Sequence, residues 1–150
     1  MADDDGHRIR RNDELKVKYD DGAYKLTRAH PTDAGLDIRA QHSGIVRAGS
    51  AQTFSTGVHV ELPPGTFGDI RPKSGLMCHK DILTFGTIDE GFDGEIMIHV
   101  FNFSREDYFI QKGDKIAQMA VVNVRYEEPE EADEIKGGER GSAGFGSTGR

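Results

Sequence analysis

Apolar and polar residues alternate in short stretches along most of the chain, and such alternation is typical of half-buried β-strands. The clearest stretches are LKVKY (15–19), GLDIRA (35–40), FSTGVHVEL (54–62), TFGDIRP (66–72), EIMIHVFNFS (95–104), DYFI (107–110) and KIAQMAVVNV (115–124). Turn sequences such as PPG at 63–65 and QKGD at 111–114 lie between them. The pattern predicts an all-β sandwich or barrel with one short helix over SGLMCHKD (74–81).

The two ends of the chain lack this alternation. Residues 1–12 are mostly charged and predict a disordered leader. The sequence EEPEEADEIKGGE (127–139) is acidic and interrupted by Pro and Gly, which is typical of a solvated linker. RGSAGFGSTGR (140–150) holds only one large apolar side chain, Phe145, so it cannot build a core. We therefore expect a β-domain over 13–126, followed by the linker and a glycine-rich tail.

Composition narrows the class of protein. Hydrophobic residues make up 35% of the 150 residues and the mean hydropathy is -0.59, which indicates polar ends or surfaces shared between subunits. The net charge of -7 gives no basic footprint for nucleic acid, so an anionic substrate needs a locally positive site. The single cysteine, Cys78, excludes an intramolecular disulfide and a zinc site built on several thiolates.

The sequence also lacks membrane and export signals. No apolar run is long enough to span a membrane, and the N-terminus has no apolar stretch like that of a signal peptide. We expect a soluble, cytoplasmic protein that binds neither membrane nor nucleic acid.

Five short segments combine residue types that are suited to chemistry: DAGLDIRA (33–40), RPKSGL (71–76), GTIDEGFDGEI (86–96), GDKIAQM (113–119) and the tail. Each also has an ordinary structural explanation when it is taken alone. These explanations are a solvated strand position for Asp37, a helix N-cap for Ser74, turn positions for Asp89 and Asp93, a backbone-bonded amide for Gln118, and a disordered end for the tail.

The RPKSGL segment has the chemistry of a phosphate site. Arg71 and Lys73 flank a proline, and Ser74 and Gly75 open a helical turn. Free N–H groups, a hydroxyl and two cations at a helix start suit phosphate oxygens. The glycine spacing of a P-loop is absent.

Asp89 lies in a Gly-rich stretch three residues before Phe92, where we expect a hairpin between Leu83 and Ile96. A carboxylate beside a flat ring suits the activation of water next to a sugar or base.

The tail has the chemistry of a lid over a ligand. Glycines allow close approach of the backbone, Phe145 can stack on a heterocycle, and Arg140, Ser147 and Thr148 can bond phosphate oxygens. Ordering the tail costs roughly 10–20 kcal/mol at about 1–2 kcal/mol per residue. Such a lid closes only on a ligand that offers many contacts, as a nucleoside triphosphate does.

Together and in this order, the five segments resemble the homotrimeric dUTPase family, from about residue 15 to residue 150. The resemblance implies a jelly-roll β-fold and a homotrimer whose three active sites are each assembled from several subunits. It implies that the C-terminal arm of one chain closes over a neighbour's site. It also implies hydrolysis of dUTP to dUMP and pyrophosphate with Mg²⁺, which removes dUTP from the DNA precursor pool and supplies dUMP for dTTP synthesis.

The resemblance also implies a role for each matching residue. Asp89 would activate the water that attacks the α-phosphate, Gln118 would lie beside that water, and Asp37 would support the sugar or the metal–triphosphate. The phosphates would contact Arg71, Lys73, Ser74, Gly75, Arg140, Ser147 and Thr148. Uracil and deoxyribose would contact Leu83, Gly86, Thr87, Ile88, Phe92, Met97, Phe145 and Gly146. Mg²⁺ would be held mainly by the triphosphate and water, with no direct side-chain ligand and with Asp37 acting through water.

Two positions depart from the family pattern. Phe92 stands where the family usually has Tyr, and LTFG (83–86) stands where many members have Asn-Ser-Pro-Gly. A phenyl ring still packs on deoxyribose, but the lost hydroxyl bond is worth about 0.5–1.5 kcal/mol. Uracil recognition is then expected from the hairpin backbone, and rejection of cytosine can reach about 10⁴-fold because its donors and acceptors are inverted.

Three other functions are less well supported by the sequence. A dCTP deaminase resembles the same fold, but the expected hairpin and the complete tail match the diphosphatase. A non-catalytic nucleotide sensor would not need Asp89, although an added interaction role remains open. A metal hydrolase is disfavoured because the six histidines show no paired ligand spacing. Cys78 has no base beside it and is expected to be a packed thiol.

Overall fold

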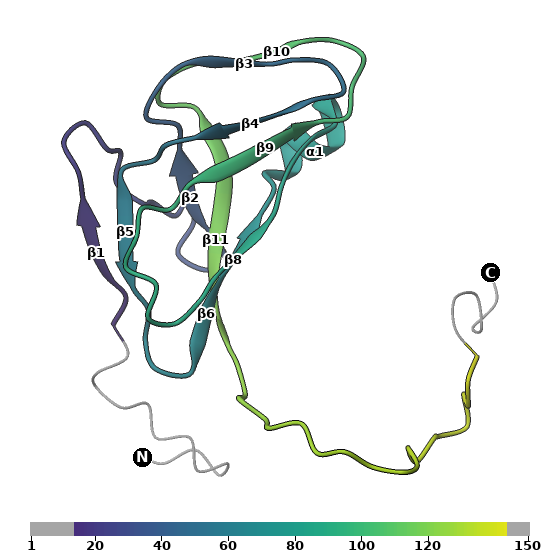
Figure 1. The fold of residues 1–150 in the computed structure, drawn as a ribbon. Helices are drawn as coiled ribbons and strands as arrows, with labels where there is room; N and C mark the ends of the chain where they lie inside the picture. The colour runs from purple at the N-terminus through teal and green to yellow at the C-terminus, as the bar shows by residue number, and fades with distance from the viewer. Residues whose placement is uncertain (1–13, 144–150) are drawn as a thin grey trace.

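The computed structural model describes residues 14–143, and nearly all of its regular structure is β-strand (Figure 1). The elements are β1 (Lys16–Tyr19), β2 (Leu36–Arg39), β3 (Gly44–Val46), β4 (Ala51–Phe54), β5 (Val58–Glu61), β6 (Thr66–Arg71), α1 (Ser74–Lys80), β7 (Ile82–Thr84), β8 (Gly86–Ile88), β9 (Ile98–Asn102), β10 (Tyr108–Ile110) and β11 (Lys115–Asn123).

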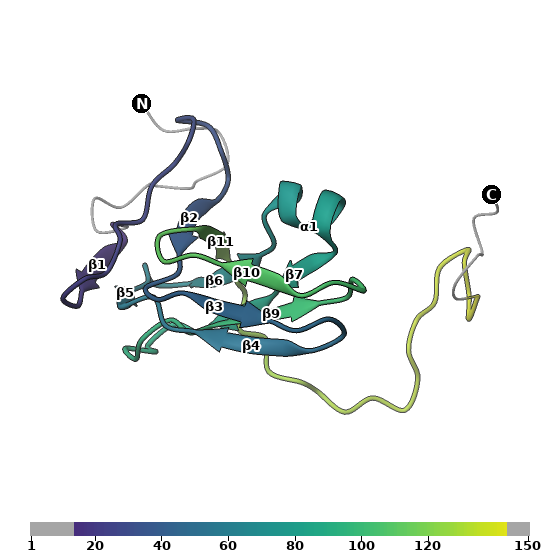
Figure 2. The same ribbon diagram turned by 90° about the horizontal axis from the view of Figure 1, so that it is seen from above.

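The strands form four short antiparallel sheets that wrap around one core. The largest has the order β2-β11-β6-β8, and the next has the order β4-β9-β7. The pairs β1-β5 and β3-β10 form the other two sheets, each with two strands (Figures 1 and 2). Strands that are distant in the sequence pair with each other throughout, which confirms the expected all-β, jelly-roll-like fold.

The core consists of inward-facing apolar side chains from all four sheets and from the crossing between them. Its largest fully buried members are Phe54, Ile38, Ile82, Ile96, Ile98, Ile110, Ile116, Met119, Val46, Val58 and Val100. The pairing register of β11 shifts between Lys115 and Ala117, so Ile116 and Ala117 are both buried although they are consecutive. This β-bulge re-aims the residues that follow it on β11, including Gln118.

Two predicted strands are shorter in the structure. FSTGVHVEL is divided because β4 ends at Phe54 and β5 begins at Val58, with Gly57 at φ +67° between them. The Thr56 hydroxyl donates to the Ile96 carbonyl at 2.6 Å instead of extending a ladder. EIMIHVFNFS is strand only over β9. Four strands, β3, β4, β7 and β8, were not expected as separate elements.

The expected hairpin around Leu83 to Ile96 is longer and less regular than predicted. β7, which contains Leu83, pairs antiparallel with β9 after Ile96, but β8 between them joins the other sheet. β8 pairs with β6, whereas β9 pairs with β4 and β7, so the chain passes from one sheet to the other after Ile88. Residues 89–97, called here the crossing segment, connect the two sheets. Its C-terminal half is bound to the β5 region, where the Ile96 N–H donates to the Val58 carbonyl at 2.8 Å. A Gly-rich turn signal is the same for a hairpin and for a crossing, so the sequence pattern does not separate them.

The predicted helix is present, but its surroundings differ from expectation. α1 begins at Ser74 and ends at Lys80, because Asp81 adopts a left-handed conformation at φ 53°. The N-cap is Lys73 rather than Ser74, and its side chain makes no capping bond. The helix lies on the outside of the β-domain and fully buries none of its residues (Figure 2). Cys78 is therefore exposed, and the expectation of a packed thiol is wrong.

The described residues after Asn123 contain no helix or strand, and beyond Tyr126 they run away from the β-domain (Figure 1). The boundaries of the leader, linker and tail stay predictions. Within residues 14–143, no helix has the length and apolar character needed to cross a membrane.

Candidate active site

Three predicted site residues lie side by side on adjacent strands of the largest sheet. Gln118 on β11 pairs with Asp37 on β2 and, on its other side, with Arg71 on β6. Neighbouring strands are about 4.8 Å apart, so these three backbone positions lie in one row across the sheet. Arg71 ends β6 and leads through Pro72 to α1. The row therefore lies next to the start of the helix.

The Asp37 carboxylate is the buried anion of this row, with 3% of the residue exposed. Lys73 donates a short hydrogen bond to Oδ1, and Lys115 Nζ lies 2.7 Å from Oδ2. Burial alone raises the pKa of this carboxyl, but the two ammonium groups outweigh burial and hold its pKa below the ordinary value. Asp37 is therefore ionised at neutral pH and is held between two cations.

Gln118 is fixed by contacts on both of its sides. Its Nε2 donates to the Pro72 carbonyl at 3.0 Å, which ties β11 to the segment that enters α1. Gly35 lies against the same side chain, and a Cβ at position 35 would fall 2.9 Å from the Gln118 Cβ. The glycine therefore provides the space that the amide occupies. The backbone-bonded amide that the sequence allowed for Gln118 is present.

The helix start presents the other predicted phosphate ligands. Arg71 is exposed, and its Nε donates to Asp69 Oδ2 at 2.7 Å. Ser74 and Gly75 are exposed at the first turn of α1, and a Cβ at Gly75 would meet nothing within 4 Å. The surface above Ser74 and Gly75 is therefore open to a ligand.

Asp89 directly follows β8 and is exposed. It lines a surface cavity of about 480 Å³ together with Phe67, Thr87, Glu90, Val124 and Tyr126. The neighbouring Glu90 accepts a hydrogen bond from the Gly65 N–H at 3.0 Å and a short one from the Tyr126 hydroxyl. These bonds lower the pKa of Glu90, with Tyr126 making the larger contribution.

Phe92 is positioned by the tight turn that follows Asp89. The Phe92 N–H donates to the Asp89 carbonyl at 3.1 Å, and Gly91 supplies the φ of +85° that this turn requires. The Phe92 ring lies over Gly94, where a Cβ would be 2.6 Å from the ring Cζ. The ring is 45% exposed, so one of its faces is available to a ligand.

The other described contacts predicted for the base and sugar lie on β7, on β8 and at the end of the crossing segment. Gly86, Thr87 and Ile88 lie on β8, where Thr87 pairs with Asp69 and Gly86 pairs with Ile70. Thr87 and Gly86 are exposed, as is Met97 at the end of the crossing segment, whereas Leu83 and Ile88 are half-buried.

The model of the dUTPase family matches residues 22–149. The chain belongs to the dUTPase family. The deoxyuridine 5′-triphosphate nucleotidohydrolase of Clostridium acetobutylicum is 42% identical over 139 residues, which cover 90% of this chain and 96% of that protein. The protein of the same description from Gloeothece citriformis is 41% identical with the same coverage.

Solved dUTPase structures have the same fold. The dUTPase of Staphylococcus bacteriophage 80alpha, solved with dUPNHPP, superposes with a TM-score of 0.84 at 27% identity, covering 91% of this chain and 99% of that one. A variant of the dUTPase from phage phi11 of S. aureus, whose structure reveals the coordination of a structural Mg(II) ion, superposes with a TM-score of 0.75 at 25% identity, covering 81% and 98%.

The predicted residues of this dUTPase fall into two groups that do not meet within one chain. The row of Asp37, Gln118 and Arg71 lies at one end of β6, whereas Ile88, the residue before Asp89, pairs with Gly68. Arg71 lies three positions along the strand from Gly68, which is about 10 Å.

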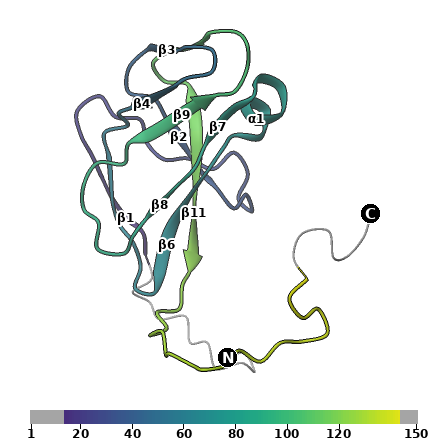
Figure 3. The same cartoon turned by 45° about the vertical axis from the view of Figure 1, so that its right-hand side comes forward.

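The tail residues belong to neither group. The described part of the tail, residues 140–143, belongs to a C-terminal segment that runs away from the sheets (Figure 3). Phe145, Gly146, Ser147 and Thr148 lie outside the described residues.

Sequence reasoning missed three residues of the site. Lys115 binds Asp37, Gly94 makes room for Phe92, and Tyr126 binds the neighbour of Asp89. Lys115 and Gly94 lie inside the quoted segments GDKIAQM and GTIDEGFDGEI. Their partners come from other strands or from within the turn, and nothing in the local pattern reports such pairs.

Proposed function

We propose that this member of the dUTPase family hydrolyses dUTP to dUMP and pyrophosphate. Family membership supports the overall reaction, and the two groups of residues suggest how it is divided. The observation that carries the proposal is the row formed by Asp37, Gln118 and Arg71 beside an open helix start. That row offers cations and backbone N–H groups to a triphosphate.

In the proposed step, a water molecule attacks the α-phosphorus and Asp89 accepts its proton. The bond from the α-phosphorus to the bridging oxygen breaks, and pyrophosphate leaves with the electron pair of that bond. Arg71 and the first-turn N–H groups of α1 stabilise the charge that develops on the phosphate oxygens. The Gln118 amide orients the water, and no covalent intermediate forms.

Mg²⁺ is proposed to be bound through the substrate. Within residues 14–143, no three His, Cys, Asp or Glu side chains gather into a metal site. Lys73 and Lys115 contact both carboxylate oxygens of Asp37, so a direct bond from Asp37 to a cation is disfavoured. Mg²⁺ retains several waters and is commonly held by substrate phosphates, which fits this set of donors. The ion would neutralise triphosphate charge.

We also propose that each site is shared between subunits of a homotrimer. The α-phosphorus must contact both the base that activates water and the phosphate ligands, and these groups lie about 10 Å apart along one sheet. If Asp89 and the crossing segment of one chain meet Arg71, Ser74 and Gln118 of another, both requirements are met. The tail of a chain would then close over a neighbour's site.

The first test measures pyrophosphate release from dUTP with Mg²⁺, with dCTP, dTTP and UTP as controls. We expect turnover of dUTP and little of the other three, with a large loss for a chain that ends at Glu139. No turnover of dUTP would contradict the proposed function, and ammonia release from dCTP would replace it with a deaminase. Equal activity without the tail would contradict the proposed lid but would leave the proposed reaction intact.

The second test mixes two inactive variants, Asp89→Asn and Arg71→Ala, by co-refolding them in equal amounts. In shared sites the two positions come from different chains, so about a quarter of the sites in random trimers hold both native residues. Activity near a quarter of the native level is expected. Activity no higher than that of the separate variants would place both residues of a site in one chain.

A further inference from the structure

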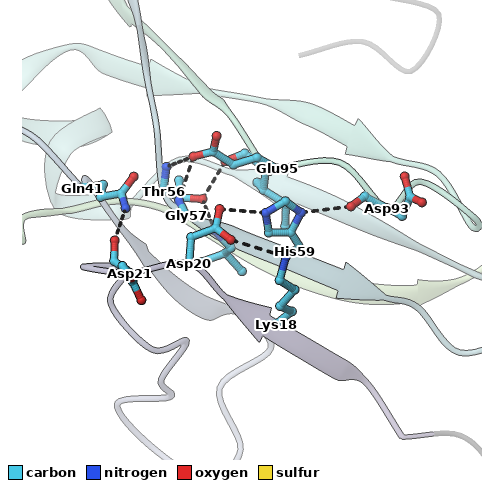
Figure 4. Close-up of polar contacts among 11 residues, drawn as sticks. Lys18, Asp20, Asp21, Gln41, Thr56, Gly57, His59, Asp93 and Glu95 are labelled. Atoms are coloured by element: carbon cyan, nitrogen blue, oxygen red, sulfur yellow. Dashed lines mark hydrogen bonds and ion pairs between the residues drawn. The ribbon is translucent and has the colours of Figure 1, made fainter.

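A second polar cluster lies where the end of β1, β5 and the crossing segment meet (Figure 4). His59 on β5 is at its centre, between the end of β1 and the crossing segment. Its Nε2 lies 2.9 Å from Asp20 Oδ2, and its Nδ1 lies 2.9 Å from the Asp93 carbonyl oxygen. The side chain is 21% exposed, so the ring is mostly enclosed.

Both nitrogens of the His59 ring face oxygen acceptors. A neutral imidazole carries one N–H, so it can donate to only one of them, and its other nitrogen then places a lone pair toward the second oxygen. The imidazolium donates to both. The geometry therefore favours the protonated ring, and the Asp93 carbonyl first and the Asp20 carboxylate second raise the pKa of His59 above its ordinary value.

The contact with Asp93 restrains the part of the chain that holds the site. Asp93 directly follows Phe92 and lies four residues after Asp89. Two further described side-chain contacts hold this half nearer to β9. Glu95 Oε1 accepts from the Thr56 and Gly57 N–H groups at 3.0 and 2.8 Å, and the Thr56 hydroxyl donates to the Ile96 carbonyl at 2.6 Å. Glu95 and Thr56 hold the end of the segment, and Glu90 is held within the turn itself. His59 is therefore the contact nearest to the turn on its C-terminal side.

We propose that His59 is a positioning residue of the dUTP site, which holds Asp89 and Phe92 in place through the Asp93 carbonyl. The inference rests on the proposed function, because it takes those two residues as parts of the site. His59 does not touch substrate in this account. It acts by limiting how far the crossing segment moves, and small displacements of a catalytic group reduce rates strongly.

The tether is expected to weaken as pH rises through the pKa of His59 in the folded protein. Among the described residues, four other charged groups lie around the ring: Lys18, Lys16, Glu61 and Asp93. Lys18 lies 3.6 Å from Asp20 and opposes protonation of His59. Lys16, Glu61 and Asp93 line the same surface hollow, whose volume is about 270 Å³.

The test compares the native chain, the His59→Gln variant and the control His42→Gln. His42 also contacts the backbone between β4 and β5, because its Nε2 accepts from the Ser55 N–H, but it does not contact the crossing segment. We expect kcat/KM for dUTP to fall about tenfold in His59→Gln and less than twofold in the control. The ratio of native to His59→Gln activity should decrease as pH rises through the pKa of His59. A ratio of one at every pH would overturn the proposal.

A spectroscopic measurement gives an independent result. The pKa of His59 is followed by NMR in the free chain and with dUpNHpp bound. If an ordered crossing segment favours the imidazolium, binding must raise this pKa by linkage. An unchanged pKa with saturating ligand would contradict the tether. A native chain that neither binds dUpNHpp nor hydrolyses dUTP would overturn the proposed function as well.

A second variant keeps the test decisive if His59→Gln fails to fold. Asp20→Asn retains the ring but replaces an acceptor with an amide that can donate to neutral Nε2. We expect the pKa of His59 to fall, and the pH at which binding of dUpNHpp weakens to move with it. A binding profile identical to that of the native chain would count against the tether.

Discussion

The two ends of β6 differ in how their predicted site residues are held. At the Arg71 end, Asp37 is buried between two ammonium groups and Gln118 is bonded to the Pro72 carbonyl. At the other end, Asp89 and Phe92 are exposed on a segment that belongs to neither sheet. The first end is held by sheet pairing and by its ion cluster, whereas the second depends on contacts that hold the crossing segment from outside.

This contrast shows where pre-organisation is needed. A triphosphate carries the same charge in every nucleotide, so the groups that bind it can be fixed by sheet pairing and by a buried ion cluster. In the proposed mechanism, the base, the sugar and the attacking water require close approach to exposed groups at the Asp89 end. A segment with few fixed contacts admits them, and its anchors at Glu90, Asp93 and Glu95 limit its freedom.

The largest expected effect belongs to Asp89. We expect Asp89→Asn to lower kcat by about 10²–10⁴-fold, since general-base catalysis contributes on that order. Affinity for dUpNHpp and the free energy of unfolding should change little, because the side chain is exposed and the amide has the same size. Steady-state kinetics measure kcat, and ligand titration measures the affinity for dUpNHpp. Asp93→Asn is the control, since only the backbone carbonyl of that residue contacts His59. Native kcat in Asp89→Asn would move the chemistry to the other end of β6.

Gly35→Ala tests the rigidity of the Arg71 end. An added Cβ would fall 2.9 Å from the Gln118 Cβ, so the amide must move. Overpacking of this kind costs about 1–3 kcal/mol of stability, and we expect kcat/KM to fall about tenfold or more. Urea unfolding and steady-state kinetics provide the two values. Gly138→Ala is the control because a Cβ there meets nothing within 4 Å. Unchanged kinetics would show that the position of Gln118 is not critical.

Asp37 is expected to make the stability of the Arg71 end of β6 depend on pH in the acidic range. Its pKa is lowered in the folded chain, so its stabilising contribution is complete above the unfolded value of 3.8 and is lost as pH falls through the folded pKa. We expect Asp37→Asn to lower the free energy of unfolding by about 1–3 kcal/mol at pH 7. The difference from the native chain should shrink below pH 3.8. Urea titrations at several pH values measure it, and a difference that is constant with pH would contradict the ion cluster.

The sequence predicted the Arg71 end better than the Asp89 end. TFGDIRP and KIAQMAVVNV alternate clearly because each has one buried face, and they are β6 and β11 in the structure. The arms of the expected hairpin around Leu83 to Ile96 do pair, as β7 and β9, but the turn signal of Gly91 and Gly94 did not show that β8 pairs with β6 between them. The bond of Lys115 to Asp37 and that of His59 to Asp93 join distant parts of the chain, and alternation reports only local structure.

The smallest expected effect comes from one hydroxyl group on the ring at position 92. Phe92→Tyr restores the residue usual in the family on a ring that already packs over Gly94. A new hydrogen bond is worth about 0.5–1.5 kcal/mol, so the preference for dUTP over UTP in kcat/KM should change by up to about tenfold. The direction expected for Phe92→Tyr is an increase. Phe92→Leu removes the flat ring and should reduce the preference for dUTP over UTP below that of the native chain. Equal preferences in all three chains would mean that sugar selection does not depend on this ring. The exposed end of β6 would then select the base alone.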